Sequence, residues 1–135
     1  SYLKVFQLFP GFVPSWRRHK TYIEAAKSLL QEQEWEDIQD AVKYAQKASK
    51  DPYAPQIDTP HDLLTKWPKL EAYYKNSIVD AQLEIISKHN IERLYNPVSM
   101  DVYNGKGWYQ EHPERSELDW LNRYYPSGIK VAPNA

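Results

Sequence analysis

Four histidines are the first side chains to consider, because histidine binds metals and transfers protons near neutral pH. A zinc site needs three or four converging ligands. The nearest approach to a ligand pair is Glu92, three positions after His89, and no short motif supplies three converging ligands. The sequence therefore predicts no metal site, and His89, which continues an apolar stripe, is expected to be a core or interface residue. The four are His19, His61, His89 and His112.

A run of carboxylates could supply general acid–base catalysis if a pocket raised the pKa of one of them. The acidic residues between Glu32 and Asp40 are interleaved with glutamines, which is typical of a solvated helix face. The serines lie in no nucleophile elbow, and segment 105–107 lacks the third glycine of a phosphate loop. The absence of cysteine excludes thiol catalysis and disulfides. We therefore predict no catalytic residue, no cofactor and no enzymatic activity.

One basic patch, Trp16 to Lys20, places two arginines, a histidine and a lysine directly after a tryptophan. Basic residues beside an aromatic ring can hold phosphates of RNA or lipid. The start of a helix is a poor place for positive charge, because the helix dipole is positive there. We expect Arg17 and Arg18 to meet acidic groups of a partner; the alternative is a charged rim around the docking site of the N-terminal segment.

The aromatic and proline content indicates a chain that is held by other chains. Five Trp, eleven Tyr and ten Pro occur among 135 residues, with only four Gly. Trp and Tyr give a large contact area and are enriched at protein interfaces. The net charge of −1 gives no general attraction to nucleic acid, so none is expected as a partner. No run approaches the ~18 apolar residues that a membrane-spanning helix needs.

Apolar spacing predicts two helices between residues 16 and 48. A stripe from His19 to Leu30 has helical period, and a second stripe from Trp35 to Ala45 is displaced from it by one position. This shift favours two helices joined near residues 31–34, with one bent helix as the alternative. Ser15 and Thr21 are both candidate N-caps.

A longer helix is predicted after the proline-containing linker 51–58. Thr59 followed by Pro60 is a helix start signal. The Trp67–Pro68 pair is expected to interrupt or kink the helix, because the residue before proline avoids helical dihedrals. The longest helix should then run over 69–95, and a short one over 113–124.

These elements predict an all-α fold, a small irregular bundle of a helical hairpin and one long helix with extended N- and C-terminal arms. Three parts are expected: an apolar docking arm at 1–14, a helical domain at 15–96 and a turn-rich C-terminal extension at 97–135. The predicted core residues are Ile23, Ala26, Leu30, Ile38, Val42, Ile78, Ala81 and Ile85.

The apolar, proline-broken segments 1–14 and 97–112 are the predicted contact sites. Their aromatic side chains left in water would form a larger patch than a monomer usually exposes. The alternative is that the N-terminal segment packs on its own helices. The residues predicted to bind partner subunits are Phe6, Phe9, Phe12, Trp16, Arg17, Arg18, Tyr103 and Trp108.

In its Trp, Tyr and Pro content the chain resembles the supernumerary subunits of mitochondrial respiratory complexes or ATP synthase. The helix–Trp35–helix segment is similar to lumenal helical proteins of photosynthetic complexes. The first resemblance implies a non-catalytic accessory subunit, peripheral to the mitochondrial inner membrane and bound to other protein subunits; Ser1 in place of Met suits a processed protein or a shortened chain. The alternatives are a thylakoid-lumen subunit and a free-standing helical module that binds a ligand or peptide in an aromatic pocket. That pocket would be lined by Trp67, Tyr73, Tyr74, Trp108 and Tyr109.

Overall fold

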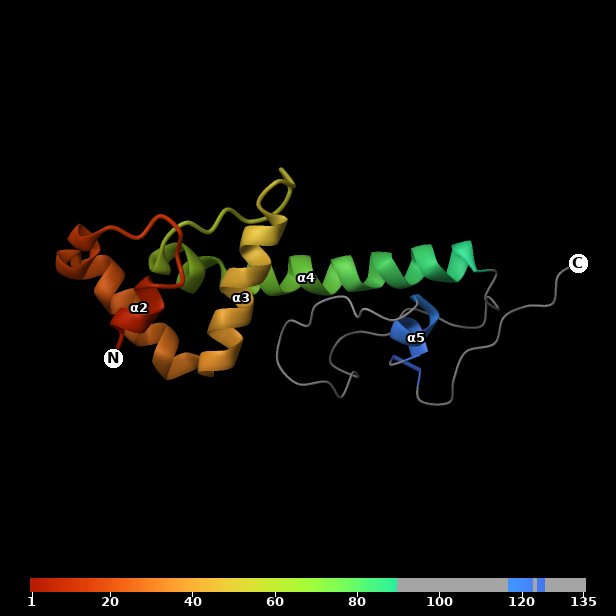
Figure 1. The fold of residues 1–135 in the computed structure, drawn as a ribbon, viewed down its shortest axis with the longest axis horizontal. Coiled ribbons are helices and arrows are strands. Elements are labelled where there is room, and N and C mark those ends of the chain that lie inside the picture. Colours follow the sequence, from red (N-terminus) through yellow and green to blue (C-terminus); the bar gives the residue numbers. More distant parts are fainter. Residues whose placement is uncertain (90–116, 123, 126–135) are drawn as a thin grey trace, which may run out of the picture. The chain divides into compact units, whose positions relative to one another are not determined.

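Every regular element in the described part of the chain is a helix (Figure 1). The structure, a computed structural model, describes residues 1–89, 117–122, 124 and 125. The predicted all-α class is confirmed. These residues divide into two units, the first covering Ser1–Tyr73 and the second beginning at Tyr74. Among the residues described, no helix is both long enough and apolar enough to cross a membrane.

The N-terminal segment folds back onto the first unit. It contains α1 (Leu3–Phe6) and is followed by the 3-10 helix η1 (Pro14–Arg18). The side chains of Val5 and Phe6 are fully buried within the chain itself. The Gln46 side chain also donates a hydrogen bond of 3.2 Å to the Leu8 carbonyl oxygen. This segment therefore supplies part of the core of the first unit.

The predicted helix–turn–helix pair is present as α2 (Lys20–Glu32) and α3 (Trp35–Ala48). Gln33 and Glu34 are extended, with ψ values of 151° and 147°, and this change of conformation ends α2 and begins α3. The expected helix start at Trp16 is wrong, because Trp16 lies in η1.

The N-cap of α2 is His19, and neither Ser15 nor Thr21 fills that position. The Nδ1 atom of His19 accepts a hydrogen bond of 3.4 Å from the Tyr22 N–H group. Such a cap satisfies one of the backbone donors that every helix start leaves unpaired. Histidine is absent from the residues that usually cap helices, so the sequence pattern did not indicate it.

Helix α4 (Pro60–Lys88) begins where the Thr59–Pro60 signal predicted. The Thr59 hydroxyl oxygen accepts a hydrogen bond of 3.1 Å from the Asp62 N–H group, and the Asp62 carboxylate accepts one of 3.1 Å from the Asp58 N–H group. Of the two outcomes predicted at Pro68, an interruption or a kink, the interruption is wrong, because α4 continues through this residue. Proline removes one backbone donor from the helix, and the buried neighbours Trp67 and Leu70 hold the helix in place there.

The second unit packs α5 (Glu117–Asn122) against the second part of α4. Leu121 is fully buried there, together with Tyr124 and Tyr125. The Tyr125 hydroxyl donates a hydrogen bond of 3.2 Å to the Gln82 side-chain oxygen. Gln82 is fully buried, so this bond satisfies a polar group that would be costly to bury unpaired. Helix α5 lies within the predicted range 113–124.

The predicted core is confirmed at five positions and wrong at three. Ile23, Leu30 and Ala81 are only half-buried, and Ala25 and Leu29 form the buried face of α2 with Ala26. The predicted stripe ran from His19, which is the N-cap of α2, to Leu30, so it missed the neighbouring positions that are buried. The predicted residues that are buried are Ala26, Ile38, Val42, Ile78 and Ile85.

Candidate protein-binding surface

An aromatic cluster joins the N-terminal segment to the start of α2. Trp16 is its centre: its ring lies 6.0 Å from Phe6, 6.0 Å from Phe9 and 5.8 Å from Phe12, measured between ring centroids. Tyr22 of α2 lies 5.1 Å from Trp16 with the rings at 72°. Edge-to-face pairs of this kind contribute about 0.5–1.5 kcal/mol beyond the area they bury. They fix the position of η1 on the first unit.

The cluster has an inner and an outer layer. Phe6 and Phe9 are 0% and 3% exposed, so they form the inner layer. Phe12 and Trp16 are half-buried and keep part of their rings in water. Val13, which lies between Phe12 and Trp16 in the sequence, is 46% exposed, as few large apolar side chains are in the described part of the chain. The outer layer is therefore an apolar surface available to a partner.

Three exposed cations border this outer layer. The Arg17 guanidinium lies 5.8 Å from the centre of the Phe12 ring, and Arg18 and Lys20, which follow within three positions of it in the chain, are exposed. No Asp or Glu occurs among residues 1–23, and no described residue forms an ion pair with any of these three cations. We call the surface formed by Phe12, Trp16, Arg17, Arg18 and Lys20 the basic face.

Two further cations of this unit lie over aromatic rings. The Lys4 ammonium is 4.4 Å from the centre of the Trp35 ring, and the Lys27 ammonium is 5.2 Å from that of Tyr2. Contacts of this kind contribute about 0.5–1 kcal/mol at exposed sites. They hold α1 to α2 and α3, so the N-terminal segment is held by its own chain on several sides.

The structure separates the predicted contact residues into three groups. The expectation that Phe6 and Phe9 are buried by another polypeptide is wrong, because their own chain buries them. Phe12, Trp16, Arg17 and Arg18 come together on the basic face. Tyr103 and Trp108 lie outside the described residues.

The alternative, an aromatic ligand pocket, is placed only in part. Tyr109 and Trp108 of that pocket lie outside the described residues. Trp67 and Tyr74 are buried core residues, and the Tyr73 hydroxyl donates a hydrogen bond to Asp51.

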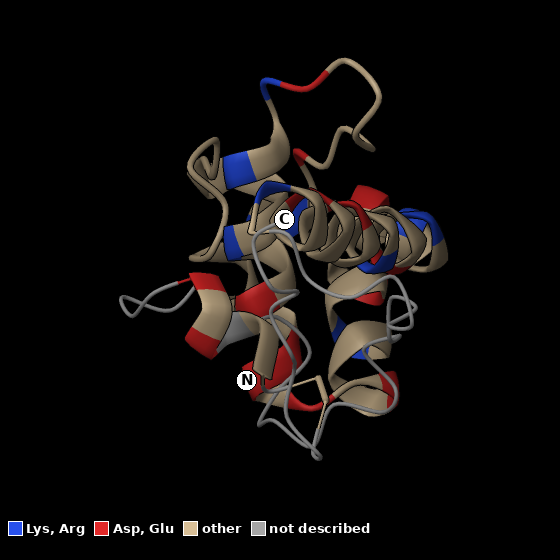
Figure 2. Ribbon diagram, turned by 90° about the vertical axis from the view of Figure 1, so that its right-hand side faces the viewer, with Lys and Arg blue, Asp and Glu red and all other residues tan. Residues whose placement is uncertain are grey.

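The acidic run lies at the corner between α2 and α3. Glu32, Glu34 and Glu36 are exposed there, as expected for a solvated face. Asp40 is half-buried on α3; burial raises its pKa, and the nearby charges of Asp37 and Glu36 raise it further. Acidic and basic residues both occur along the described helices (Figure 2).

A tyrosine–carboxylate pair in the first unit was not predicted. The Tyr73 hydroxyl donates a hydrogen bond to one oxygen of Asp51, and the other oxygen accepts one of 2.9 Å from the Tyr53 N–H group. The bond to Asp51 raises the pKa of Tyr73 to about 12 and lowers the pKa of Asp51. The partners are 22 positions apart, so no local spacing could have indicated the pair.

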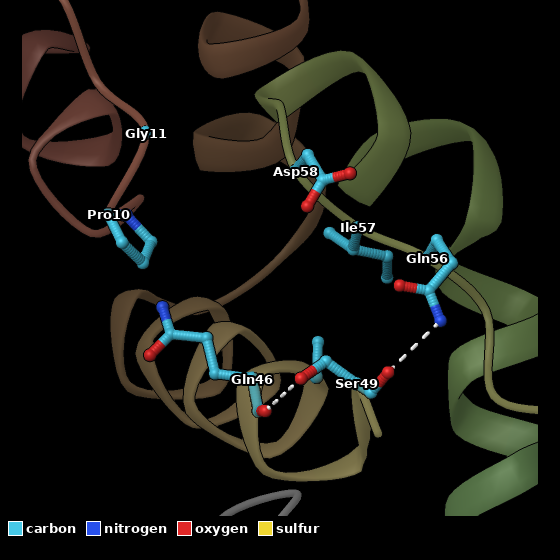
Figure 3. Close-up of a pocket in the computed structure, with 8 residues that line it drawn as sticks. Pro10, Gly11, Gln46, Ser49, Gln56, Ile57 and Asp58 are labelled. Atoms are coloured by element: carbon cyan, nitrogen blue, oxygen red, sulfur yellow. Dashed lines mark hydrogen bonds between the residues drawn. The ribbon is translucent and has the colours of Figure 1, made fainter. Parts of the chain in front are cut away.

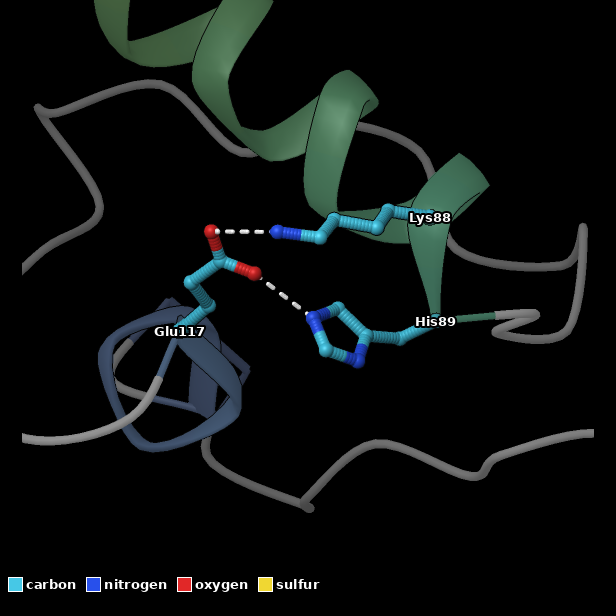
Figure 4. Close-up of polar contacts among 3 residues, drawn as sticks. All are labelled: Lys88, His89 and Glu117. Carbon is cyan, nitrogen blue, oxygen red and sulfur yellow. Dashed lines mark hydrogen bonds and ion pairs between the residues drawn. The ribbon is translucent and has the colours of Figure 1, made fainter.

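A second polar cluster lies in the second unit (Figure 4). The Glu117 carboxylate contacts the Lys88 ammonium at 3.2 Å and the His89 Nε2 atom at 2.6 Å. These hydrogen bonds, first that of His89 and then that of Lys88, lower the pKa of Glu117. His89 was predicted to be a core or interface residue; it is half-buried and ties α4 to α5. The cluster holds one imidazole and one carboxylate, which suits a structural tie.

Within the described ranges, no group of three or more His, Asp or Glu residues could hold a metal ion. Comparisons of the chain with protein-family models, with curated proteins and with solved structures found no match.

Proposed function

We propose that the chain is a non-catalytic accessory subunit of a large, membrane-associated energy-transducing complex, such as a mitochondrial respiratory complex or ATP synthase. In this role it stabilises the assembly by contacting neighbouring protein subunits at the periphery of the inner membrane. The basic face is the observation that carries the proposal. The aromatic and proline content described above is what favours this kind of complex.

The charges of the basic face favour an external acidic partner. Arg17, Arg18 and Lys20 gather at the N-terminus of α2, where the helix dipole is positive and destabilises cations. The first turn of α2 has no acidic residue to offset them. Carboxylates of a neighbouring subunit would relieve this repulsion, so binding gains more free energy than three isolated surface pairs would give.

The aromatic part of the basic face provides the apolar contact. Trp and Arg are the residues that most often dominate the binding energy of protein interfaces. Trp16 is held in place by rings on several sides, so its side chain loses little conformational entropy when a partner covers it. An Arg–Trp surface with a fixed geometry is therefore suited to a lasting contact between subunits.

The proposal is tested with the tagged chain expressed in its own cells. We expect the wild-type chain to migrate on native gels with a multi-subunit complex, and the R17E/R18E variant to migrate mainly as the free chain. The matched control is K50E/K69E, which makes the same change of charge at two exposed lysines of the first unit. Wild-type chain that migrates only as a monomer in gentle detergent would overturn the proposal.

A further inference from the structure

A groove of about 340 Å³ lies in the first unit (Figure 3). The turn after α1, the last turns of α3 and the linker before α4 form its walls. Its volume is at the lower end of the range of about 300–1,000 Å³ that is usual for ligand pockets. None of its residues belongs to the basic face. The lining residues are Pro10, Gly11, Ala45, Gln46, Ser49, Gln56, Ile57 and Asp58.

The polar lining of the groove consists mainly of hydrogen-bond acceptors. The Gln56 Nε2 atom donates to the carbonyl oxygens of Ser49 and Ala54, each at 3.4 Å. The Gln46 amide donates to Leu8, and the Ser49 hydroxyl donates to the Gln46 carbonyl oxygen at 2.7 Å. Most of these donors are used inside the fold, which leaves the side-chain oxygens as the main groups offered to a ligand.

A carboxylate adds negative charge to this lining. No described residue forms a hydrogen bond or ion pair with the Asp58 side chain. Figure 3 shows Gln56, Ile57 and Asp58 on one side of the groove and Pro10 and Gly11 on the other. A cation also lies at this region: the Lys66 ammonium donates to the Gln56 carbonyl oxygen at 2.8 Å.

The remaining walls are apolar or open. Pro10, Ala45 and Ile57 present aliphatic carbon to the groove. A Cβ atom added at Gly11 would meet no other atom within 4 Å, so this wall has free space in front of it. The groove also lies at the C-terminal end of α3, where the helix dipole is negative and favours cations.

We propose that this groove binds an alkylammonium group, carried by a lysine side chain of another polypeptide or by a small primary amine. The aliphatic stem lies between Pro10 and Ile57. The ammonium, which has three donors and no acceptor, donates to the Asp58 carboxylate and the Gln56 side-chain oxygen. This inference goes beyond the proposed function and uses none of its residues.

The test is a titration of the ¹⁵N-labelled chain with n-butylammonium chloride, followed by NMR. We expect the signals of the Gly11 backbone amide and the Gln46 and Gln56 side-chain amides to shift together and to saturate. n-Butanol, which has the same stem without the charge, should not produce these shifts. Sodium chloride at the same ionic strength corrects for general salt effects.

Two variants decide the outcome. Asp58→Asn removes the charge and should weaken binding about tenfold or more, as expected for loss of a charge-assisted hydrogen bond, whereas the matched change Glu32→Gln at an exposed site should have no effect. Gly11→Leu adds bulk at a lining residue where a Cβ atom meets no other atom within 4 Å, and it should abolish the shifts. Unchanged affinity in both D58N and G11L would overturn the inference.

A second titration identifies the source of the amine. If an acetylated and amidated Gly-Lys-Gly peptide binds more tightly than n-butylammonium, the ligand is a lysine side chain of a polypeptide. If the peptide binds equally or more weakly, the ligand is a free amine. Neither result depends on the basic face, so failure of the groove and failure of the proposed accessory role are distinguishable.

Discussion

Single residues in this chain have environments that shift their pKa values in opposite directions. Asp51 uses its two carboxylate oxygens for two different donors, the Tyr73 hydroxyl and the Tyr53 N–H group. The bonds favour the charged carboxylate and disfavour the charged phenolate. The pair therefore holds together the loop after α3 and the first part of α4 over a wide pH range.

We predict that one tyrosine resists ionisation in alkali. The pKa of Tyr73 is raised to about 12, so its proton stays bound in the folded state at pH values where it leaves the unfolded chain. The stability that it contributes is therefore fully present below pH 10 and is lost between pH 10 and about 12. Ultraviolet titration should show one late tyrosine, and Asp51→Asn should move it to the main transition. A single transition in the wild type would contradict this prediction.

At the Lys88–His89–Glu117 cluster we predict loss of stability in acid. The pKa of Glu117 is lowered by its hydrogen bonds with His89 and Lys88. The contribution of Glu117 to stability is present above its pKa in the unfolded chain, near 4.5. It is lost as the pH falls through the lower pKa that Glu117 has in the folded state. The protection factors of the α5 amides, which are corrected for the pH dependence of intrinsic exchange, should fall over that range. Glu117→Gln should lower these protection factors at neutral pH and remove most of their acid dependence.

At the scale of elements, the helix boundaries could be predicted better than the helix faces. Thr59 and Pro60 mark a helix start through local backbone chemistry, which does not depend on what the helix packs against. The start of α4 was therefore predicted correctly. The buried face of α2 is set by its packing against α1, η1 and α3, which apolar spacing alone does not show, and its start was missed because His19 is an uncommon cap. Pro68 does not interrupt α4, because the burial of Trp67 and Leu70, a tertiary effect, outweighs the cost of one missing hydrogen bond.

The buried face of α2 leads to a prediction with a matched control. Leu29 is 1% exposed on α2, whereas Leu83 is 49% exposed on α4. Leu29→Ala should lower the free energy of unfolding by about 2–5 kcal/mol, and Leu83→Ala should change it by about 0.5 kcal/mol or less. Urea denaturation measures both. Equal effects would mean that Leu29 does not lie on a buried face of α2.

The N-terminal segment shows why the candidate site was only partly predicted. Its aromatic density indicates burial but does not specify which chain does the burying. The structure assigns Phe6 and Phe9 to the core of their own unit and leaves Phe12 and Trp16 at the surface. Arg17 and Arg18 are exposed, and their predicted contact with acidic groups of a partner stays a prediction.

Removal of the N-terminal segment should therefore unfold the first unit, rather than only release the chain from a complex. Phe6→Ala is expected to cost about 3–5 kcal/mol, because Phe6 is fully buried and contacts Tyr2, Phe12 and Trp16. A chain lacking residues 1–14 should lose helical circular dichroism and melt at a lower temperature. Retention of the full signal and melting temperature would show that the segment is dispensable for the fold.

At the scale of the whole molecule, the net charge conceals an uneven distribution. The chain carries a formal charge of −1, yet the cations of the basic face and the acids of the α2–α3 corner lie at opposite ends of α2. A helix of 13 residues separates its ends by about 20 Å. This separation exceeds the Debye length of about 10 Å at 0.1 M salt, so each end acts as a separate charge toward other molecules.

That charge separation should govern how the purified protein behaves as a colloid. Molecules with little net charge and two separate surface regions of opposite charge attract one another when the salt concentration is low. The second virial coefficient from light scattering should therefore be negative at about 10 mM ionic strength, where the Debye length is about 30 Å, and should rise as salt is added. The protein should thus dissolve better in moderate salt than in water, the reverse of a chain whose like charges repel.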